Sequence, residues 1–144
     1  MTNLSIICGK IPRDIVLDAL FYYLESDLNE MFLDTSDIRM VLSNSSHPIE
    51  DMSKRLSDTL KTSQAYIVAD WNVYRKSTAY VRVLHKIDIS DYVIIVNYDK
   101  SGLGKKTKAT RSSEDLCKKK GKEYRVIDMS FDEQNNAVFS NMEI

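Results

Sequence analysis

The stretch from Gln64 to Gly104 constrains the fold of this chain more than any other part of the sequence. It holds two strand-like apolar runs, Ala65–Ala69 and Asp91–Asn97, separated by about one helix of sequence. Within the second run, Tyr92–Val96 is a continuous β-branched segment, which is typical of a strand buried on both faces. Polar residues follow each run, and ligands of open parallel α/β sheets bind outside the carboxyl ends of the strands. We therefore expect the functional site at these two strand ends.

The rest of the chain continues this alternation of strands and helices. Further strands are predicted at Leu4–Cys8, Ile38–Leu42 and Tyr124–Met129, and helices at Pro12–Asn29, Pro48–Thr62, the later part of Asn72–Ile87, and Ala109–Lys120. The pattern predicts a three-layer, Rossmann-like α/β domain with a mostly parallel five-stranded sheet. This domain would span residues 1–129. Residues 130–144 would be a C-terminal tail that either forms an extra edge strand or remains loose.

Composition narrows the class of protein. A chain of 144 residues with 43% hydrophobic and 28% charged residues is expected to form one globular domain. Its formal net charge of −1 gives no reason to expect a nucleic-acid partner. No apolar run is long enough for a membrane span, and the N-terminus does not resemble a signal peptide, so we expect a cytoplasmic protein. Cys8 and Cys117 are then expected to be reduced thiols, and no cofactor or metal site is indicated.

Several short motifs resemble those of the Rossmann-like SLOG superfamily, the proteins related to DprA and Lonely Guy. In the YspA-like branch of that family a strand delivers Ala-Asp-Trp, a Tyr follows, and a helix opens with a segment like Ala-Gly-Pro-Ile-Arg-Asn. This chain has Ala69-Asp70-Trp71, then Tyr74, then Thr78-Ala79-Tyr80-Val81-Arg82, followed by Tyr92–Val96, Gly102-Leu103-Gly104, Ala109-Thr110 and Gly121 in the family's order. The resemblance covers about Leu4 to Asp128.

The glycine motifs depart from that family. Where the family has Gly-Gly-x-Arg-Gly-Ala-Asp after the second strand, this chain has the glycine-free segment Ser43-Asn44-Ser45-Ser46-His47-Pro48. Lonely Guy enzymes carry Gly-Gly-x-Gly-Thr-x-x-Glu with a catalytic Glu, whereas here Ser113 stands three residues after Thr110 and Glu114 is one place off. The family fold is expected to be kept and its pocket to be altered.

The resemblance implies a nucleotide or nucleotide-derived small molecule as the ligand, because SLOG relatives sense or process such compounds. Binding for sensing or sequestration, as in a phage-encoded counter-defence protein, is the leading interpretation, without catalysis. One alternative is an enzyme that cleaves an N-glycosidic bond with Glu114 as its acid. Another is a protein-binding inhibitor or adaptor with a vestigial pocket. SLOG relatives often pair through helices, so a homodimer is expected.

The loop after the Tyr92–Val96 strand is the candidate phosphate site. Backbone N–H groups and the helix dipole would favour an anion there, with Thr110 as the helix cap; a solvated loop is the alternative. The candidate ligand-binding residues are Gly9, Lys10, Arg13, Ser45, Ser46, Asp70, Trp71, Arg75, Arg82, Asn97, Gly102, Gly104, Lys105, Thr107 and Thr110. Arg75 and Arg82 are the candidates for bidentate phosphate contacts, although Arg82 could instead brace its helix against Asp70 or Asp91.

Basic residues are concentrated between Lys105 and Arg125. This segment has nine basic and three acidic residues, while the whole chain carries a net charge of −1. It could dock an acidic protein partner, or it could be an ordinary solvated helix face.

Overall fold

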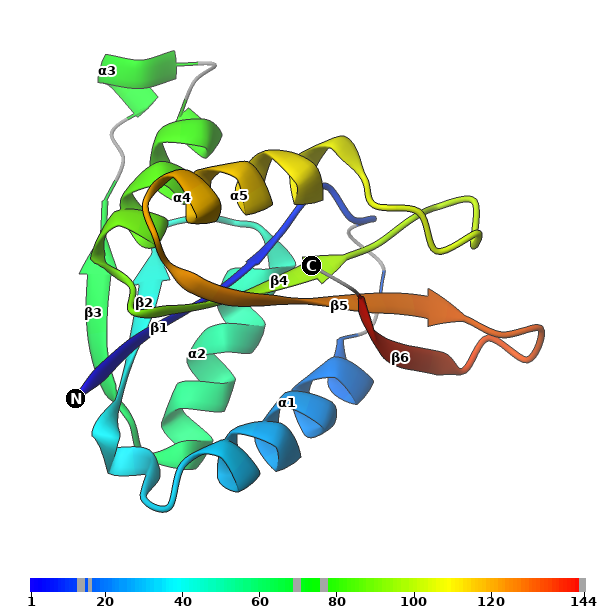
Figure 1. Cartoon of the computed structure of the whole chain (residues 1–144), viewed down its shortest axis with the longest axis horizontal. Helices are drawn as coiled ribbons and strands as arrows, with labels where there is room; N and C mark the ends of the chain where they lie inside the picture. The colour runs from blue at the N-terminus through cyan, green and yellow to red at the C-terminus, as the bar shows by residue number, and fades with distance from the viewer. Residues whose placement is uncertain (13–14, 16, 69–70, 76–77, 143–144) are drawn as a thin grey trace.

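A computed structural model of the chain describes residues 1–12, 15, 17–68, 71–75 and 78–142, with only the backbone of Trp71 and Tyr74. The strands form one sheet of six in the order β3-β2-β1-β4-β5-β6 (Figure 1). The first five strands pair in parallel, and β6 is antiparallel to β5. The structure therefore confirms the Rossmann-like α/β class and the parallel five-stranded arrangement that the sequence predicts.

The elements follow one another with few interruptions. The strands are β1 (Thr2–Cys8), β2 (Ile38–Ser43), β3 (Ser63–Ile67), β4 (Tyr92–Asn97), β5 (Glu123–Phe131) and β6 (Ala137–Met142). The helices are α1 (Asp18–Met31), the 3-10 turn η1 (Thr35–Asp37), α2 (Pro48–Leu60), α3 (Trp71–Tyr74), α4 (Thr78–Ile89) and α5 (Lys108–Lys119).

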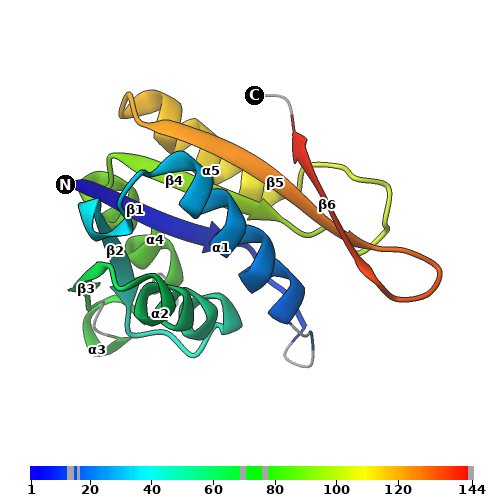
Figure 2. The ribbon, with the colours of Figure 1, turned by 90° about the horizontal axis from the view of Figure 1, so that it is seen from below.

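Helices cover both faces of the sheet, α1 and α2 on one side and α4 and α5 on the other (Figure 2). Successive side chains of a strand point to opposite faces. In β4, Ile94 and Val96 accordingly join the core under α1 and α2, while Val93 and Ile95 join the core under α4 and α5. All four side chains are at most 1% exposed. This two-sided burial explains the unbroken apolar run of β4.

Some boundaries differ from the predicted ones. Helix α1 begins at Asp18 rather than at Pro12, and Ile11 and Leu17 are buried in the connection that precedes it. Strand β3 ends at Ile67, and Ala69 lies outside the described residues. Arg75, with a φ of 49°, ends α3 in the left-handed region, so only the later part of the predicted Asn72–Ile87 helix is continuous, as expected.

The C-terminal tail adopts the first of its two predicted alternatives, the edge strand. Beyond the turn at residues 132–136, β6 pairs with β5 from Ala137 to Met142. Phe139 of β6 stacks on Tyr23 of α1, with ring centroids 4.7 Å apart. This contact fastens the edge strand to the helical layer. Within the described residues, no helix is both long and apolar enough to cross a membrane.

Replacing Phe139 by Ala is expected to lower the free energy of unfolding by about 1–3 kcal/mol, because it removes a half-buried aromatic contact. The neighbouring Val138, which is 47% exposed, is the matched control, and Val138→Ala is expected to change stability by less than about 0.5 kcal/mol. Urea denaturation of both variants measures the difference. Equal effects would show that the stacking does not hold β6.

Candidate functional site

The topological switch point of the sheet lies between β1 and β4. The chain builds β2 and β3 on one side of β1 and then crosses to place β4 on the other side. Cys8 near the end of β1 is in register with Val96 of β4, so the loops that leave both strands meet at one edge. The sequence analysis expected the site at the exits of β3 and β4. In the sheet, β2 and β1 lie between these two strands.

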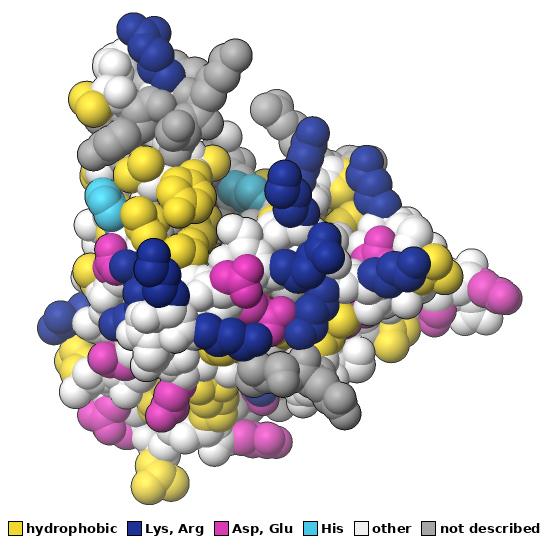
Figure 3. All heavy atoms as spheres, turned by 45° about the horizontal axis from the view of Figure 1, so that its top comes forward, with side chains coloured by type: hydrophobic (Ala, Val, Ile, Leu, Met, Phe, Trp, Pro, Cys, Tyr) yellow, Lys and Arg dark blue, Asp and Glu magenta, His cyan; other side chains and the backbone are white. Residues whose placement is uncertain are grey.

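A cleft of about 390 Å³ opens at this edge between α4 and α5, and we call it the α4–α5 cleft. The apolar part of its lining consists of Ile7, Cys8, Ala79, Tyr80, Val83, Ala109 and Leu116. In Figure 3, hydrophobic side chains gather on this face beside many Lys and Arg side chains. Small-molecule sites have this volume and this mixture of apolar walls and few polar groups.

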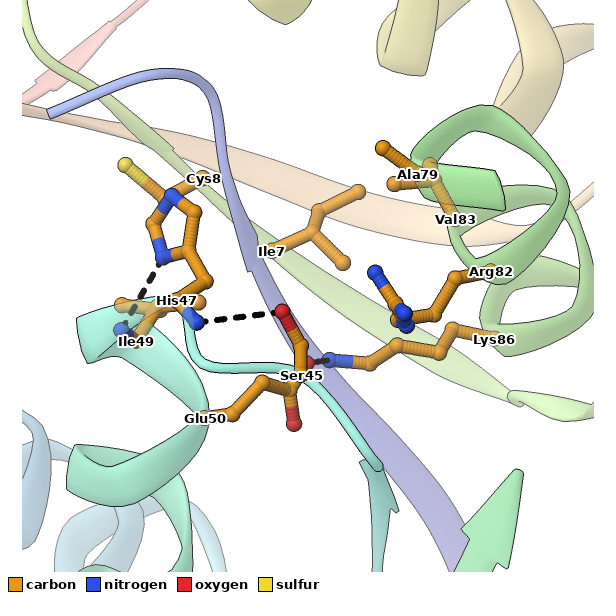
Figure 4. A pocket seen from close by; sticks show the side chains of 10 residues that line it. All are labelled: Ile7, Cys8, Ser45, His47, Ile49, Glu50, Ala79, Arg82, Val83 and Lys86. Atoms are coloured by element: carbon orange, nitrogen blue, oxygen red, sulfur yellow. Dashed lines mark hydrogen bonds and ion pairs between the residues drawn. The ribbon is translucent and has the colours of Figure 1, made fainter. Parts of the chain in front are cut away.

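A smaller space of about 110 Å³, the inner pocket, continues the cleft toward the loop after β2 (Figure 4). The two spaces share Ile7, Cys8, His47, Ala79 and Val83. The inner pocket adds polar groups from the loop after β2, from α2 and from α4, namely Ser45, Glu50, Arg82 and Lys86. The inner pocket therefore holds three charged side chains, Glu50, Arg82 and Lys86.

A buried ion pair forms the floor of the inner pocket. Lys86 Nζ lies 2.8 Å from Glu50 Oε1, and the two side chains are 2% and 7% exposed. Lys86 Nζ also donates to the carbonyl of Ile6 at 2.9 Å, and Glu50 Oε2 accepts the backbone N–H of Ser43 at 3.0 Å. Burial lowers the pKa of Lys86 below its usual 10.5, and the adjacent Glu50 carboxylate acts in the opposite direction. Every charge of this pair is thus matched within the protein.

Arg82 differs from that pair because it has no counter-ion among the described residues. It lies one turn before Lys86 on α4 and extends from the helix toward the loop after β2 (Figure 4). Its Nε is buried without a hydrogen-bond partner. The expected braces of Arg82 were Asp70, which lies outside the described residues, and Asp91, which instead accepts the N–H of Asn3 at 2.9 Å. A buried guanidinium nitrogen without an acceptor is costly, and an anion in the pocket would supply that acceptor.

His47 connects the loops on the other wall of the inner pocket. Its Nδ1 accepts the N–H of Ile49 and so caps α2, which places the ring hydrogen on Nε2 for donation to the carbonyl of Gly9 at 2.8 Å. His47 is not among the candidate ligand-binding residues of the sequence analysis. Its position directly before Pro48, which opens the helix, was the available signal for a capping residue.

Gly9 allows the loop after β1 to approach α5 closely. A Cβ at this position would lie 2.6 Å from the Cβ of Ala109, which is too close for any side chain. Gly9 and Lys10 both line the α4–α5 cleft and a neighbouring space of about 350 Å³ beside Thr107 and Lys108. The structure therefore brings three of the candidate ligand-binding residues, Gly9, Lys10 and Thr107, together at one edge.

The predicted phosphate loop after β4 is organised around its own carboxylate. Asp99 accepts the N–H groups of Ser101 and Lys105 at 3.1 and 3.0 Å, and the hydroxyl of Ser101 at 2.8 Å. These hydrogen bonds, led by the N–H of Lys105, lower the pKa of Asp99 below its usual 3.8. Gly102 and Gly104 have φ values of 73° and 69°, which this tight loop requires. The Asp99 carboxylate thus occupies backbone N–H groups that could otherwise donate to a phosphate.

Asn97 ties this loop to α5. Its side-chain oxygen accepts the N–H of Thr107 and the hydroxyl of Thr110, and its amide donates to Asp128 and to the carbonyl of Lys105. The cap of α5 is Thr107, whose hydroxyl oxygen accepts the N–H of Thr110 at 3.2 Å. The prediction that Thr110 caps the helix is wrong, because Thr110 is buried inside its first turn. Asn97 and Thr110 therefore hold the loop after β4 against the start of α5 and do not face the cleft as ligand-binding residues.

Other predicted residues lie elsewhere or are not described. Arg13, Asp70 and the side chain of Trp71 lie outside the part of the chain that the structure describes. Arg75 and Ser46 are exposed, and neither lines the cleft or the inner pocket. Ser45 lines the inner pocket, where its hydroxyl accepts the N–H of His47 at 3.0 Å.

Glu114, the candidate catalytic acid, is engaged away from the cleft. It is 4% exposed and lies 2.9 Å from Lys106 Nζ, and the hydroxyl of Tyr124 donates to it at 3.1 Å. Burial and this contact with Glu114 raise the pKa of Tyr124 to about 12.

In the cleft itself, burial raises the pKa of Cys8 to about 12, so its thiol stays protonated at neutral pH.

The basic segment forms one wall of a further space of about 450 Å³ beside the cleft. Lys108, Arg111 and Lys119 line it from one face of α5, together with the 54% exposed Tyr80 of α4. Other lysines of the segment are paired, since Lys120 contacts the Asp88 carboxylate and Lys122 donates to the Asp88 carbonyl. The outer end of the cleft is therefore positively charged.

Comparison with models of known protein families, with curated proteins and with solved structures found no match to this chain. The SLOG resemblance accordingly stays a prediction. Fold and site together define a Rossmann-like α/β domain with a cleft at its switch point. Among the described residues, no group of His, Cys, Asp and Glu side chains could hold a metal ion.

Replacing Asp99 by Ala is expected to release the loop after β4, because the amides of Ser101 and Lys105 lose their acceptor. Hydrogen exchange of these two amides should then approach the rates of an unprotected peptide. In the unmodified chain, this protection should be present above pH 3.8 and be lost as the pH falls through the lowered pKa of Asp99.

Asp132→Ala is the matched control for this experiment. Asp132 accepts the amides of Gln134 and Asn136 in the β5–β6 turn, so its loss should expose those amides alone. Unchanged protection of Lys105 in Asp99→Ala would contradict the role of Asp99 in the loop.

Proposed function

We propose that this chain binds a nucleotide-derived small molecule in the α4–α5 cleft, with an anionic group of the ligand at Arg82. The observation that carries this proposal is the state of Arg82, a cation with a buried, unpartnered Nε in the inner pocket that continues the largely apolar cleft. A phosphate or carboxylate accepts two parallel hydrogen bonds from a guanidinium, which is the geometry that an unpaired Arg offers.

The remainder of the cleft suits the uncharged part of such a ligand. Ile7, Ala79, Val83 and Leu116 supply apolar walls at which a base or a sugar would exclude water. The exposed ring of Tyr80 at the outer end offers a stacking surface for a base. Position supports the proposal as well, since α/β domains of this topology bind ligands at the switch point.

Binding without chemical conversion is part of the proposal. Three groups of the cleft and the inner pocket that could act as acid, base or nucleophile are already paired, hydrogen-bonded or held in the protonated form. Glu50 is paired with Lys86, the thiol of Cys8 is protonated, and His47 uses both ring nitrogens for Ile49 and Gly9. A role in sensing or sequestering the ligand follows from such a site.

A thermal-shift screen against mono-, di- and cyclic nucleotides, NAD and ADP-ribose tests the proposal. A ligand at a hundred times its Kd should add about 2.7 kcal/mol of apparent stability, which is a rise in Tm of several degrees. Arg82→Gln should abolish the shift. Arg55→Gln is the matched control, because Arg55 is exposed, pairs with Asp18 and lies outside the cleft.

The absence of a shift with every compound would contradict the proposed function. A shift that survives in Arg82→Gln would place the ligand elsewhere on the molecule. Liquid chromatography of the bound compound after incubation checks the second half of the proposal, and recovery of the unchanged ligand is expected.

A further inference from the structure

Glu50 is the carboxylate that lines the inner pocket together with two cations of α4. Arg82 and Lys86 are four residues apart and therefore lie on the same face of the helix. Both line the inner pocket with Glu50, yet only Lys86 is paired with it, at 2.8 Å. Both carboxylate oxygens of Glu50 are used, one by Lys86 and the other by the N–H of Ser43.

The net charge of the inner pocket depends on which of the two cations, Lys86 or Arg82, is paired with Glu50. Glu50 neutralises Lys86, so the pocket retains the one positive charge of Arg82. If Lys86 carried no charge, Glu50 would be a buried carboxylate without a counter-ion, which is strongly unfavourable. Arg82 would then be the cation in the same pocket that could neutralise it.

We propose that Lys86 sets the charge specificity of the inner pocket, because by holding Glu50 it keeps Arg82 free for a compact oxyanion of the ligand, a phosphate or a carboxylate. This inference rests on the proposed function of the same site. It assigns Lys86 a positioning role that differs from direct contact with the ligand. Lys86 acts on the ligand only through Glu50 and Arg82.

The hydrogen bonds of Lys86 suit this role. Its Nζ donates to the Ile6 carbonyl of β1 at 2.9 Å, which holds the ammonium at the floor of the pocket beside Glu50. Arg82 contributes a repulsion that lowers the pKa of Lys86, so the two cations are close enough to influence one another. The N–H of Ser43 holds the second oxygen of Glu50 on the side of β2.

The alternative is that the ion pair only braces α2, α4 and β1. The two roles differ for the double variant Glu50→Gln/Lys86→Met, which removes both charges. A bracing role predicts that the double variant is at least as damaged as Lys86→Met. A charge-setting role predicts that the double variant recovers, because no carboxylate is left to neutralise Arg82, and replacing a whole buried pair is often neutral for stability.

The experiment compares the wild-type chain, Lys86→Met, Glu50→Gln and the double variant in two measurements. The first is NMR titration with ADP-ribose and with inorganic phosphate. Lys86→Met is expected to weaken binding by roughly tenfold to a hundredfold, the value of one charge-assisted hydrogen bond, and the double variant to bind within about threefold of wild type. If Lys86→Met does not fold, Lys86→Gln tests the same loss of charge with a side chain that can still donate to Ile6.

The second measurement needs no ligand. Phenylglyoxal condenses with accessible guanidinium groups, more slowly when they are ion-paired, and peptide mass spectrometry gives its rate of reaction at Arg82. This rate is expected to fall in Lys86→Met and to return in the double variant. Arg55, which is exposed and paired with Asp18, is the internal reference and should react equally in all four proteins.

The outcomes separate the two proposals. Equal reactivity of Arg82 in wild type and Lys86→Met, or a double variant as impaired as Lys86→Met, would overturn the role of Lys86. A wild-type chain that binds neither probe nor any nucleotide would overturn the proposed function. In that case the phenylglyoxal rates still decide whether Lys86 keeps Arg82 unpaired.

Discussion

Lys86 and Glu50 form an ion pair that is almost excluded from solvent, and three elements meet at it. Lys86 belongs to α4, Glu50 to α2, and the carbonyl that Lys86 also contacts belongs to β1. Removing one partner of such a pair lowers the stability of the fold far more than removing both, because it leaves the other charge buried without a counter-ion. The consequence reaches beyond stability, because this pairing leaves Arg82 as the unmatched charge of the inner pocket.

The loop after β4 and the inner pocket both contain hydrogen-bond donors beside a carboxylate of the protein, but the carboxylate is paired differently in each. In the loop after β4, the backbone N–H groups that could receive a phosphate already bind the carboxylate of Asp99. In the inner pocket, the available carboxylate is held by Lys86, and the donor Arg82 stays open. A site can accept an external anion only where its hydrogen-bond donors are not already bound to a carboxylate of the protein. On this account, the positions of Asp99 and Glu50 matter more than the number of donors.

The fold was predictable because its signals are local. The β-branched run Tyr92–Val96 and the amphipathic helices indicate their elements without knowledge of distant contacts. The site was predictable only in part. Gly9 and Lys10 line the α4–α5 cleft and Ser45 and Arg82 line the inner pocket, while the strand order makes β1, and not β3, the neighbour of β4. The pairing of Glu50 with Lys86 joins residues 36 positions apart, and nothing in a single sequence marks such a contact.

The central claim is that Arg82 lacks a partner in the free protein and gains one from the ligand. NMR observation of the Arg82 Nε–H group during titration with the nucleotide panel tests this claim most directly. The account predicts that one compound shifts the Arg82 resonance and slows its exchange with solvent, while the resonance of Arg55 is unchanged. An Arg82 resonance that is unaffected by every compound at millimolar concentration would contradict the account.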